Sequence, residues 1–335
     1  MIEAKVAYLE EAYDLHFRNV SLDDNISSDE ILCETLVSVI SPGTEVAAYT
    51  GMPPLKPGNT YPRLVGYCNV ARVLKIGNKT SGLSVGDRVL TTQSHRSHFI
   101  IKKDEVLCLV PQGVESQHAA CGYLYHLGYD AVLKAGVNLG QKVVVIGLGV
   151  LGLTSVAMAS KAGGTVYGIS NHAKPKRIAL NNGAQIVYER GELSKLKNIL
   201  GEQLADVVIT TSGTWSDWDM ALDIAGQNSF IAVLGFPGRG EKDPVNNPLD
   251  SQHFYTKQLH IKAVGRSPEN NDSRNYLPFN QKSSLSFILD EINLKMLNPD
   301  ELITANYSWN KLEEAYLSLI SKEDSPITYL LEWKK

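Results

Sequence analysis

Between Lys142 and Gly163 the sequence reads KVVVIGLGVLGLTSVAMASKAG. It starts with a run of β-branched residues, Val143 to Ile146, which is typical of a strand buried on both faces of a parallel sheet. A glycine-rich turn follows. Val150 to Ala162 then continues with mostly small and apolar residues and no proline, as a packed helix does. Strand, turn and helix therefore stand in the order that a dinucleotide-binding unit requires.

Three glycines of the turn, Gly147, Gly149 and Gly152, have G-x-G-x-x-G spacing. The first permits the tight turn, the second lets the backbone approach a pyrophosphate, and the third lets the helix pack closely on its strand. The free N–H groups of the helix N-terminus then face the anion. A glycine-rich turn without a ligand is the alternative. The residues that we expect around the pyrophosphate are Gly147, Leu148, Gly149, Val150, Leu151 and Gly152.

The choice between NAD and NADP depends on the end of the second strand. Thr165 to Ile169 is followed by Ser170, where an NAD site usually has Asp or Glu. The Ser170 hydroxyl can donate a hydrogen bond to a 2′-phosphate. Lys174 and Arg177 stand at the start of the next predicted helix, where positive charge is unfavourable to the helix dipole unless an anion is bound. Solvated charges at a helix start are the alternative. The residues expected to read the phosphate are Ser170, Asn171, His172, Lys174 and Arg177, and further cofactor contacts are expected from Thr211, Gly235 and Phe236.

The composition excludes several classes of protein. The chain has 335 residues, 43% of them hydrophobic and 20% charged, which favours a folded globular protein of two domains. The net charge is −4 and the sequence has no run of basic residues, so it does not predict a basic surface for binding nucleic acid or an anionic membrane. No apolar stretch is long enough for a membrane helix, and Met1 to Val20 is too acidic for a secretion signal, so we expect a cytoplasmic location. The four cysteines form no C-x-x-C pair.

The rest of the chain divides into three parts. The N-terminal third, to about Pro111, alternates apolar and polar residues in short strands and predicts a small β-rich domain, followed by helical Glu115 to Ala135. Beyond Gly265 the polar run SPENNDSRN resembles a linker, and helical and strand segments complete the chain. The middle part predicts a doubly wound α/β sheet of six parallel strands: Val143–Ile146, Thr165–Ile169, Ala184–Tyr188, Ala205–Ile209, Phe230–Leu234 and Leu259–Val264.

Over essentially its whole length the chain resembles the medium-chain dehydrogenase/reductase superfamily. The match is carried by SPGTEVAAYTG at residues 41–51, YPRLVGYCNVARV at 61–73, VGDRV at 85–89, HLGYDAV at 126–132 and LITANYSWNKLEEAY at 302–316. The resemblance implies a GroES-like catalytic domain of residues 1–123 and 266–335, a Rossmann domain of residues 124–265, and an active site in the cleft between them. It also implies a homodimer paired through the edge strand Leu259 to Val264.

The zinc ligands of the superfamily are missing from this chain. Where zinc-containing members have a cysteine, a G-H-E triplet and a third ligand, this sequence has Pro42, Gly66-Tyr67-Cys68 and Tyr123. Proline cannot ligate, and neutral tyrosines are poor zinc ligands. We therefore expect no catalytic metal, and polarisation of the substrate carbonyl by hydrogen-bond donors.

The candidate catalytic residues follow from the same alignment of motifs: Thr44, Tyr67, Tyr123 and His126. Thr44 takes the position of the hydroxyl that relays the substrate proton, and a turn-capping role is the alternative. The two tyrosines are expected to face one cavity, either as donors to a developing alkoxide or as pocket lining. His126 either orients Tyr123 from the same helix face or is an ordinary interior histidine.

Three other residues are given structural roles by the sequence. Cys68 is expected to be a buried filler, and Glu45 a surface or structural carboxylate. His95 and His98 are three positions apart. On a strand that spacing places them on opposite faces, which argues against a metal site.

The function expected from the sequence is a zinc-independent, NADP(H)-dependent oxidoreductase. It exchanges hydride with a small polar carbonyl or alcohol, and the nicotinamide does the chemistry. An enoyl or quinone reductase acting on an activated C=C bond is the alternative enzyme. A non-catalytic NADPH-binding or sensing protein is the alternative of another class.

Overall fold

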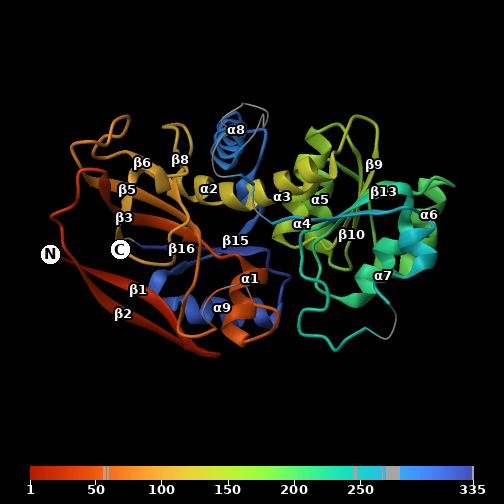
Figure 1. Ribbon diagram of the computed structural model, residues 1–335, viewed down its shortest axis with the longest axis horizontal. Coiled ribbons are helices and arrows are strands. Elements are labelled where there is room, and N and C mark those ends of the chain that lie inside the picture. The colour runs from red at the N-terminus through yellow and green to blue at the C-terminus, as the bar shows by residue number, and fades with distance from the viewer. Residues whose placement is uncertain (56–57, 59, 245–246, 266, 269–279, 334–335) are drawn as a thin grey trace. The chain divides into compact units, whose positions relative to one another are not determined.

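The chain forms two compact units in a computed structural model that describes residues 1–55, 58, 60–244, 247–265, 267–268 and 280–333 (Figure 1). Unit 1 comprises Met1–Tyr123 and Pro268–Lys335, and unit 2 comprises Leu124–Ser267. Within the described ranges no helix is both long and apolar enough to cross a membrane. Most of the predicted linker SPENNDSRN lies outside the described residues.

Unit 1 is built on two β-sheets to which both ends of the chain contribute. A hairpin of β1 (Ile2–Glu11) and β2 (Asp14–Leu22) is extended by β4 (Arg63–Leu64) into a three-stranded sheet. The larger sheet has the order β15-β16-β3-β5-β6-β8, with β7 paired to β3. Its strands are β3 (Glu30–Val39), β5 (Cys68–Ile76), β6 (Arg88–Thr91), β7 (His98–Lys102), β8 (Cys108–Leu109), β15 (Ile303–Ser308) and β16 (Thr328–Glu332).

The C-terminal strand of unit 1 joins the N-terminal part of the chain. β16 pairs antiparallel with β3, with Leu330 opposite Val39, so the two chain ends share one sheet. Helices α1 (Pro42–Thr50) and α9 (Leu312–Ser321) pack over a common core that includes Tyr49, Tyr316 and Leu331. The other helices of this unit are α2 (Ser116–Ala120) and α8 (Gln281–Asn293), with short 3-10 turns at Lys103–Glu105, Pro299–Glu301 and Trp309–Lys311.

Helix α1 was not expected from the sequence, in which residues 41–51 were treated only as a family motif. Its local signals are nevertheless present. Ser41 is the N-cap residue with extended backbone angles, and Pro42 occupies the first helical position, where its missing N–H costs nothing. Gly51 ends the helix with φ of 69°, a left-handed conformation that suits glycine. Thr44 therefore lies in the first turn of a helix.

Unit 2 confirms the predicted parallel sheet of six strands. The order is β11-β10-β9-β12-β13-β14, and every pairing is parallel, so the first strand after the N-terminal unit lies at the centre. This is the doubly wound dinucleotide fold. The strands are β9 (Lys142–Ile146), β10 (Thr165–Ile169), β11 (Ala184–Tyr188), β12 (Ala205–Thr210), β13 (Ala225–Val233) and β14 (His260–Ala263).

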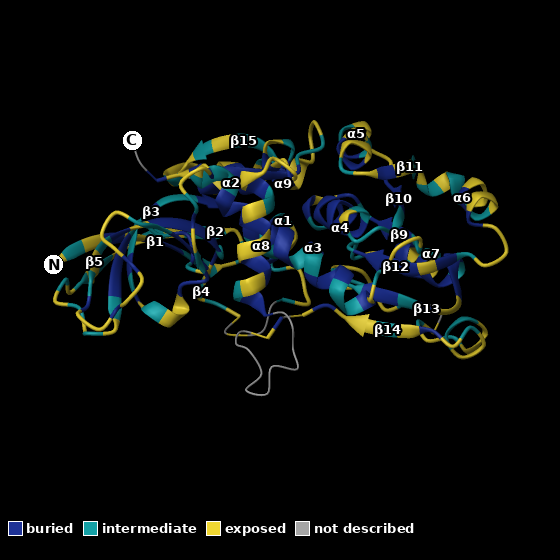
Figure 2. Ribbon diagram, turned by 90° about the horizontal axis from the view of Figure 1, so that it is seen from above, coloured by how far each residue is buried: buried dark blue, intermediate teal, exposed yellow. Residues whose placement is uncertain are grey.

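Helices alternate with these strands, and burial follows the order of the sheet. α4 and the central strands are buried, whereas the edge strand β14 is largely exposed (Figure 2). β13 begins directly after α7, five residues before the predicted start at Phe230. The prediction missed these residues because the polar Gln227 and Asn228 give no apolar strand signal. The helices are α3 (Gly122–Ala135), α4 (Val150–Lys161), α5 (Ala173–Asn181), α6 (Leu193–Leu200) and α7 (Trp215–Ile224), with short turns at Arg190–Glu192 and Ser251–Tyr255.

Candidate functional site

The glycine-rich turn of unit 2 has the geometry that its sequence predicts. Gly147 has φ of 86°, which favours glycine. A Cβ on Gly152 would lie 1.8 Å from the carbonyl oxygen of Gly147, so only glycine lets α4 start this close to the turn. A Cβ on Gly149 would meet nothing within 4 Å, and Gly149 caps α4 without any side-chain hydrogen bond. The first N–H groups of α4, from Val150 onward, therefore have no side-chain cap at Gly149, and there is open space on the side of Gly149 where a Cβ would lie.

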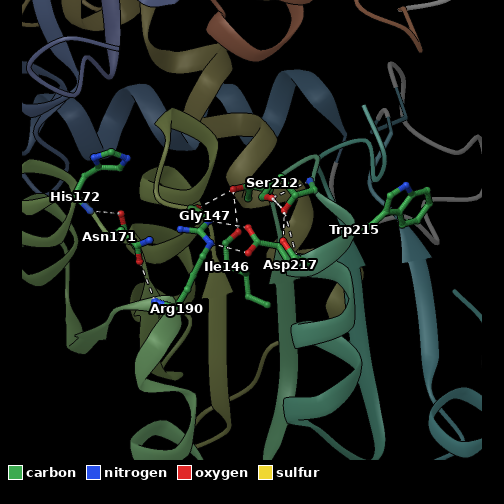
Figure 3. Close-up of polar contacts among 12 residues, drawn as sticks. Ile146, Gly147, Asn171, His172, Arg190, Ser212, Trp215 and Asp217 are labelled. Atoms are coloured by element: carbon green, nitrogen blue, oxygen red, sulfur yellow. Dashed lines mark hydrogen bonds and ion pairs between the residues drawn. The ribbon is translucent and has the colours of Figure 1, made fainter. Parts of the chain in front are cut away.

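Thr211 supports this turn from the next strand along the sheet. Its Oγ1 donates to the carbonyl oxygen of Gly147 at 2.7 Å and lies 3.2 Å from that of Ile146 (Figure 3). Gly235 packs behind Thr211, since a Cβ there would lie 2.6 Å from the Thr211 carbonyl oxygen. Phe236 follows; this residue is 46% exposed, and its ring centroid lies 4.4 Å from Cζ of Arg239. Three expected cofactor contacts thus lie beyond the ends of β12 and β13.

The loop after β10 carries the residues expected to read the phosphate. Ser170 is buried, and its Oγ accepts the backbone N–H of His172 at 3.3 Å. Asn171, His172 and Arg177 are exposed, and Lys174 is partly exposed at the start of α5. No carboxylate follows β10 at these positions, and within the described residues no ion pair is formed by Lys174 or Arg177.

Arg190, which sequence reasoning missed, joins this loop to α7. Its guanidinium donates two hydrogen bonds of 2.7 Å to the carboxylate of Asp217, and its backbone N–H donates to Asn171 Oδ1 at 3.0 Å (Figure 3). The signal in the sequence was that Arg190 is a cation two positions after β11. β11 lies next to β10 in the sheet. Arg190 thus contacts Asn171 through its backbone and Asp217 through its side chain, at the carboxyl edge of the sheet.

Burial and hydrogen bonding act in opposite directions on Asp217. Removal from water on its own raises the pKa of this carboxyl group. Hydrogen bonds from Arg190, Ser212 and Thr214 outweigh that effect and leave the pKa below its usual value. The hydrogen bonds to Asp217 raise the pKa of Arg190. Both groups are therefore charged near neutral pH.

Unit 1 brings together the hydroxyl groups of Ser41, Thr44 and Tyr67. The Tyr67 hydroxyl donates to Ser41 Oγ, and Thr44 also hydrogen-bonds to this phenol. Burial raises the pKa of Tyr67 well above its usual value, and these two hydrogen bonds offset only part of the effect. Tyr67 is therefore a neutral phenol. Ser41 was missed by sequence reasoning, although its place as the N-cap residue of α1 was a usable signal.

Tyr123 packs against Tyr67; the expectation that both phenols face one cavity stays a prediction. The ring centroids are 5.5 Å apart at an interplanar angle of 71°, an edge-to-face contact. Gln281 Nε2 donates to the Tyr123 hydroxyl at 3.3 Å. His126 lies one turn further along α3 and is buried, and this burial lowers its pKa to about 4. His126 is therefore neutral near pH 7.

Of the two alternatives expected for Glu45, a surface or a structural carboxylate, the structure supports the second: Glu45 is 2% exposed, and its Oε2 lies 2.8 Å from His95 Nε2. The expectation for His95 and His98 needs correction. His95 does not lie on a strand with His98, because β7 begins at His98 and His95 is fully buried in the loop before it. Alternation along a strand therefore does not describe this pair. Cys68 is buried, as expected.

Comparison with known proteins agrees with this geometry. Residues 150–282 match the family model described as zinc-binding dehydrogenase. Sorbitol dehydrogenase of Halalkalibacterium halodurans is 25% identical over 84% of this chain and 86% of that protein. The structure of 2R,3R-butanediol dehydrogenase from Bacillus subtilis covers 99% of this chain with a TM-score of 0.81 at 16% identity.

The chain belongs to the medium-chain dehydrogenase/reductase superfamily. It is thus an oxidoreductase of that superfamily. Human quinone oxidoreductase is a further relative, 29% identical, although the match spans only 52% of this chain and 56% of that protein. The prediction from the sequence that Pro42, Tyr67 and Tyr123 replace the zinc ligands of zinc-containing members stays a prediction. In the part of the chain that the structure describes, no group of three or more His, Cys, Asp or Glu side chains could hold a metal ion.

Proposed function

We propose that this protein is a zinc-independent, NADP(H)-dependent oxidoreductase that exchanges hydride between nicotinamide and a small polar carbonyl or alcohol. The observation that carries the proposal is the open turn at Gly149 beside a second strand that ends in Ser170 instead of a carboxylate. The residues present fit a dinucleotide, because the first N–H groups of α4 have no side-chain cap and a Cβ on Gly149 would meet nothing within 4 Å.

The preference for NADP is supported by the charges around the loop after β10. Lys174 and Arg177 have no ion-pair partner among the described residues, whereas Lys176 lies 2.7 Å from Glu189 Oε1 and is already paired. A carboxylate after β10 would repel a 2′-phosphate, and Ser170 does not. We assign Ser170, Asn171 and His172 to the same phosphate-reading loop.

The chain's own part in the reaction is to hold the substrate oxygen among neutral hydroxyl groups. When bound, the nicotinamide supplies or accepts the hydride. Because its raised pKa keeps Tyr67 a neutral phenol, we assign it to carbonyl polarisation, in which its single hydroxyl hydrogen passes from Ser41 Oγ to the substrate oxygen, with Thr44 beside it. Tyr123 remains a candidate proton donor, and His126, neutral near pH 7, is assigned to its orientation.

A substrate panel tests the function. The purified protein is incubated with NADPH and, separately, with ketoses such as fructose, a simple ketone and a quinone, and the loss of NADPH is followed. Reduction of a carbonyl to an alcohol is the expected result. Turnover of none of these compounds, with NADPH still bound, would leave the non-catalytic binding protein as the better description.

The zinc prediction is tested on the same sample. We expect elemental analysis to find no stoichiometric zinc, and turnover to survive treatment with a chelator, because Pro42 cannot ligate and neutral phenols bind zinc poorly. One zinc per chain, lost together with activity on chelation, contradicts the proposal.

A quinone or enoyl reductase is the second candidate. The 29% identity to human quinone oxidoreductase favours it specifically, and so does the set of neutral hydroxyls, which requires no Lewis acid. Product analysis separates the two candidates. A new alcohol from a ketone supports the first, and loss of an alkene or reduction of a quinone supports the second.

Two further expectations remain proposals. We propose a homodimer paired through β14, the outermost described strand of the unit 2 sheet, whose His260, Lys262 and Ala263 are exposed. The cytoplasmic location expected from the sequence also stays a prediction.

A further inference from the structure

A buried network of polar side chains connects α1, α9 and the loop before β7 at Glu45. This carboxylate, on α1, is 2% exposed. Its Oε1 accepts the backbone N–H of Ser41 at 2.6 Å. Its Oε2 accepts the hydroxyl of Tyr316 from α9 at 2.7 Å and lies 2.8 Å from Nε2 of His95. Three groups capable of donating hydrogen bonds therefore surround one carboxylate, which is the arrangement that stabilises the anion.

On its other side, His95 contacts the hydroxyl group of Ser38. His95 Nδ1 lies 2.8 Å from Ser38 Oγ, and Trp333 Nε1 donates to the same oxygen at 2.9 Å. A hydroxyl has one hydrogen and two acceptor lone pairs, so Ser38 can accept from Trp333 and donate its own hydrogen to Nδ1. Every donor and acceptor then has a partner when His95 is neutral, with its proton on Nε2, and Glu45 is ionised.

His95 also fixes the backbone that carries Tyr67. Its backbone N–H donates to the carbonyl oxygen of Val65 at 2.8 Å, and its carbonyl oxygen accepts from Ala7 at 2.9 Å. The imidazole lies directly against Gly66, since a Cβ on that residue would be 2.6 Å from His95 Cγ. Gly66 has φ of 86°, so both sterics and conformation require glycine there. Tyr67 is the next residue.

The His95 imidazole thus contacts both residues of the Tyr67–Ser41 hydrogen bond indirectly, Tyr67 through Gly66 and Ser41 through Glu45. The ring packs under the residue that precedes Tyr67, and through Glu45 it holds the backbone N–H of Ser41, whose Oγ accepts the Tyr67 hydroxyl. We propose that His95, as a neutral imidazole paired with ionised Glu45, is a positioning residue for the hydroxyl cluster of Ser41, Thr44 and Tyr67. This rests on the proposed function, in which the cluster holds the substrate oxygen.

The charge assignment is tested without any substrate. Nitrogen-15 NMR of the full chain at pH 7, with His95 assigned from a His95→Gln variant, distinguishes the two neutral tautomers from imidazolium. We expect the Nε2–H tautomer. An Nδ1–H tautomer, or an imidazolium at this pH, would overturn the proposal.

The positioning role is tested with a matched pair of substitutions between α1 and α9. Tyr316→Phe removes the donor to Glu45, whereas Tyr49→Phe removes an equivalent hydrogen bond, from Tyr49 to Glu313 at 2.8 Å, outside the network. The carbon-13 Cζ resonance of Tyr67, assigned from Tyr67→Phe, should shift in Tyr316→Phe and in His95→Leu and stay in place in Tyr49→Phe. An unmoved Tyr67 resonance in both network variants contradicts the proposal.

Turnover provides a second readout with whichever panel compound is reduced. We expect kcat to fall about 10- to 100-fold in His95→Leu, because displacements of about 1 Å at a reacting centre have effects of this size. The KM for NADPH should stay within about twofold, and His95→Gln, which keeps an N–H donor for Glu45, should recover part of kcat. Normal kcat in His95→Leu, or equal losses in Tyr49→Phe, would overturn the role.

The two proposals fail in different ways. If no panel compound is reduced, the proposed function is contradicted. The NMR measurements still test the positioning role of His95, because they need no substrate. If His95→Leu does not fold, Tyr316→Phe and His95→Gln carry the same comparison.

Discussion

Lys174 and Arg177 differ from their neighbour Lys176 in a way that makes the cofactor assignment testable. Lys176 is paired with Glu189 at 2.7 Å, whereas no partner is described for the other two cations in the resolved loop and helix. A 2′-phosphate bound here gains charge-assisted hydrogen bonds of roughly 1.5 kcal/mol or more each. The three cations of one short segment therefore provide both the test and its control.

The first prediction concerns cofactor affinity. Lys174→Ala and Arg177→Ala should each raise the dissociation constant of NADPH by about 10-fold and leave that of NADH nearly unchanged. Lys176→Ala should change neither. Fluorescence titration of the three variants with both cofactors measures this. Equal affinities for NADH and NADPH in the parent protein, insensitive to both substitutions, would show that this loop does not read the phosphate.

Asp217 gives a prediction for pH dependence at the same scale. Its pKa in the folded protein is lower than its usual value, so its pairing with Arg190 stabilises the fold fully above the unfolded pKa of about 4. That stabilisation is lost as the pH falls through the lowered folded pKa. Since Arg190 is 34% exposed, we expect Asp217→Asn to lower the free energy of unfolding by only about 1 kcal/mol at pH 7.

Urea unfolding of the parent and of Asp217→Asn at several pH values measures this effect. The difference in unfolding free energy should be the same at pH 7 and pH 5, and should shrink below about pH 4. A difference that stays constant down to pH 3 would mean that the lost contribution does not come from an ionised carboxylate.

At the scale of elements, the junction of β9 and α4 uses its glycines for different purposes. Gly152 is required by packing, because a Cβ would lie 1.8 Å from the Gly147 carbonyl oxygen. Gly149 has φ of −72°, which any residue adopts, and a Cβ there would meet nothing within 4 Å. Its side of the turn is left open for a ligand.

These two glycines give the third prediction. Gly152→Ala should lower the free energy of unfolding by about 3 kcal/mol or more, since the backbone must shift to admit the methyl group. Gly149→Ala should change stability by less than about 1 kcal/mol yet weaken NADPH binding by on the order of 10-fold, because its methyl group enters the space of the pyrophosphate. Thermal unfolding and cofactor titration measure both. Unchanged binding in Gly149→Ala would place the pyrophosphate elsewhere.

At the scale of the whole molecule, the exposed edge of the unit 2 sheet is the surface that we assign to dimerisation. Val264 donates its backbone N–H to Val233 on β13 at 2.9 Å. In a parallel strand, alternate residues point their N–H and C=O groups to the same side, so Ile261 and Ala263 direct theirs outward. An unpaired row of such groups favours pairing with a second copy of the chain.

The fourth prediction follows from that edge. Light scattering at micromolar concentration should give the mass of a dimer, and Ala263→Pro, which removes one outward N–H, should shift it to a monomer while leaving the bonds to β13 intact. A monomer mass for the parent protein contradicts the assignment.

The six parallel strands of unit 2 could be predicted because the signal of each strand is local. Val143 to Ile146 is apolar on both faces, as a central parallel strand must be, and the spacing of Gly147, Gly149 and Gly152 reflects backbone geometry within six residues. Helix α1 had local signals too, in Ser41, Pro42 and Gly51, although they were not used. In such segments the physical constraint and the residues that meet it are neighbours in the chain.

The partners of the polar side chains were decided only by the tertiary structure. Arg190 and Asp217 are 27 residues apart, Tyr67 and Ser41 are 26 apart, and Glu45 and Tyr316 are separated by 271 positions. Periodicity indicates which face of an element is buried, but a buried carboxylate or phenol bonds to whichever donor the packing of other elements brings within 3 Å. Sequence alone therefore determined the sheet, the turn and the candidate cofactor loop, while the hydroxyl cluster and the Glu45–His95 network exist because distant segments pack together.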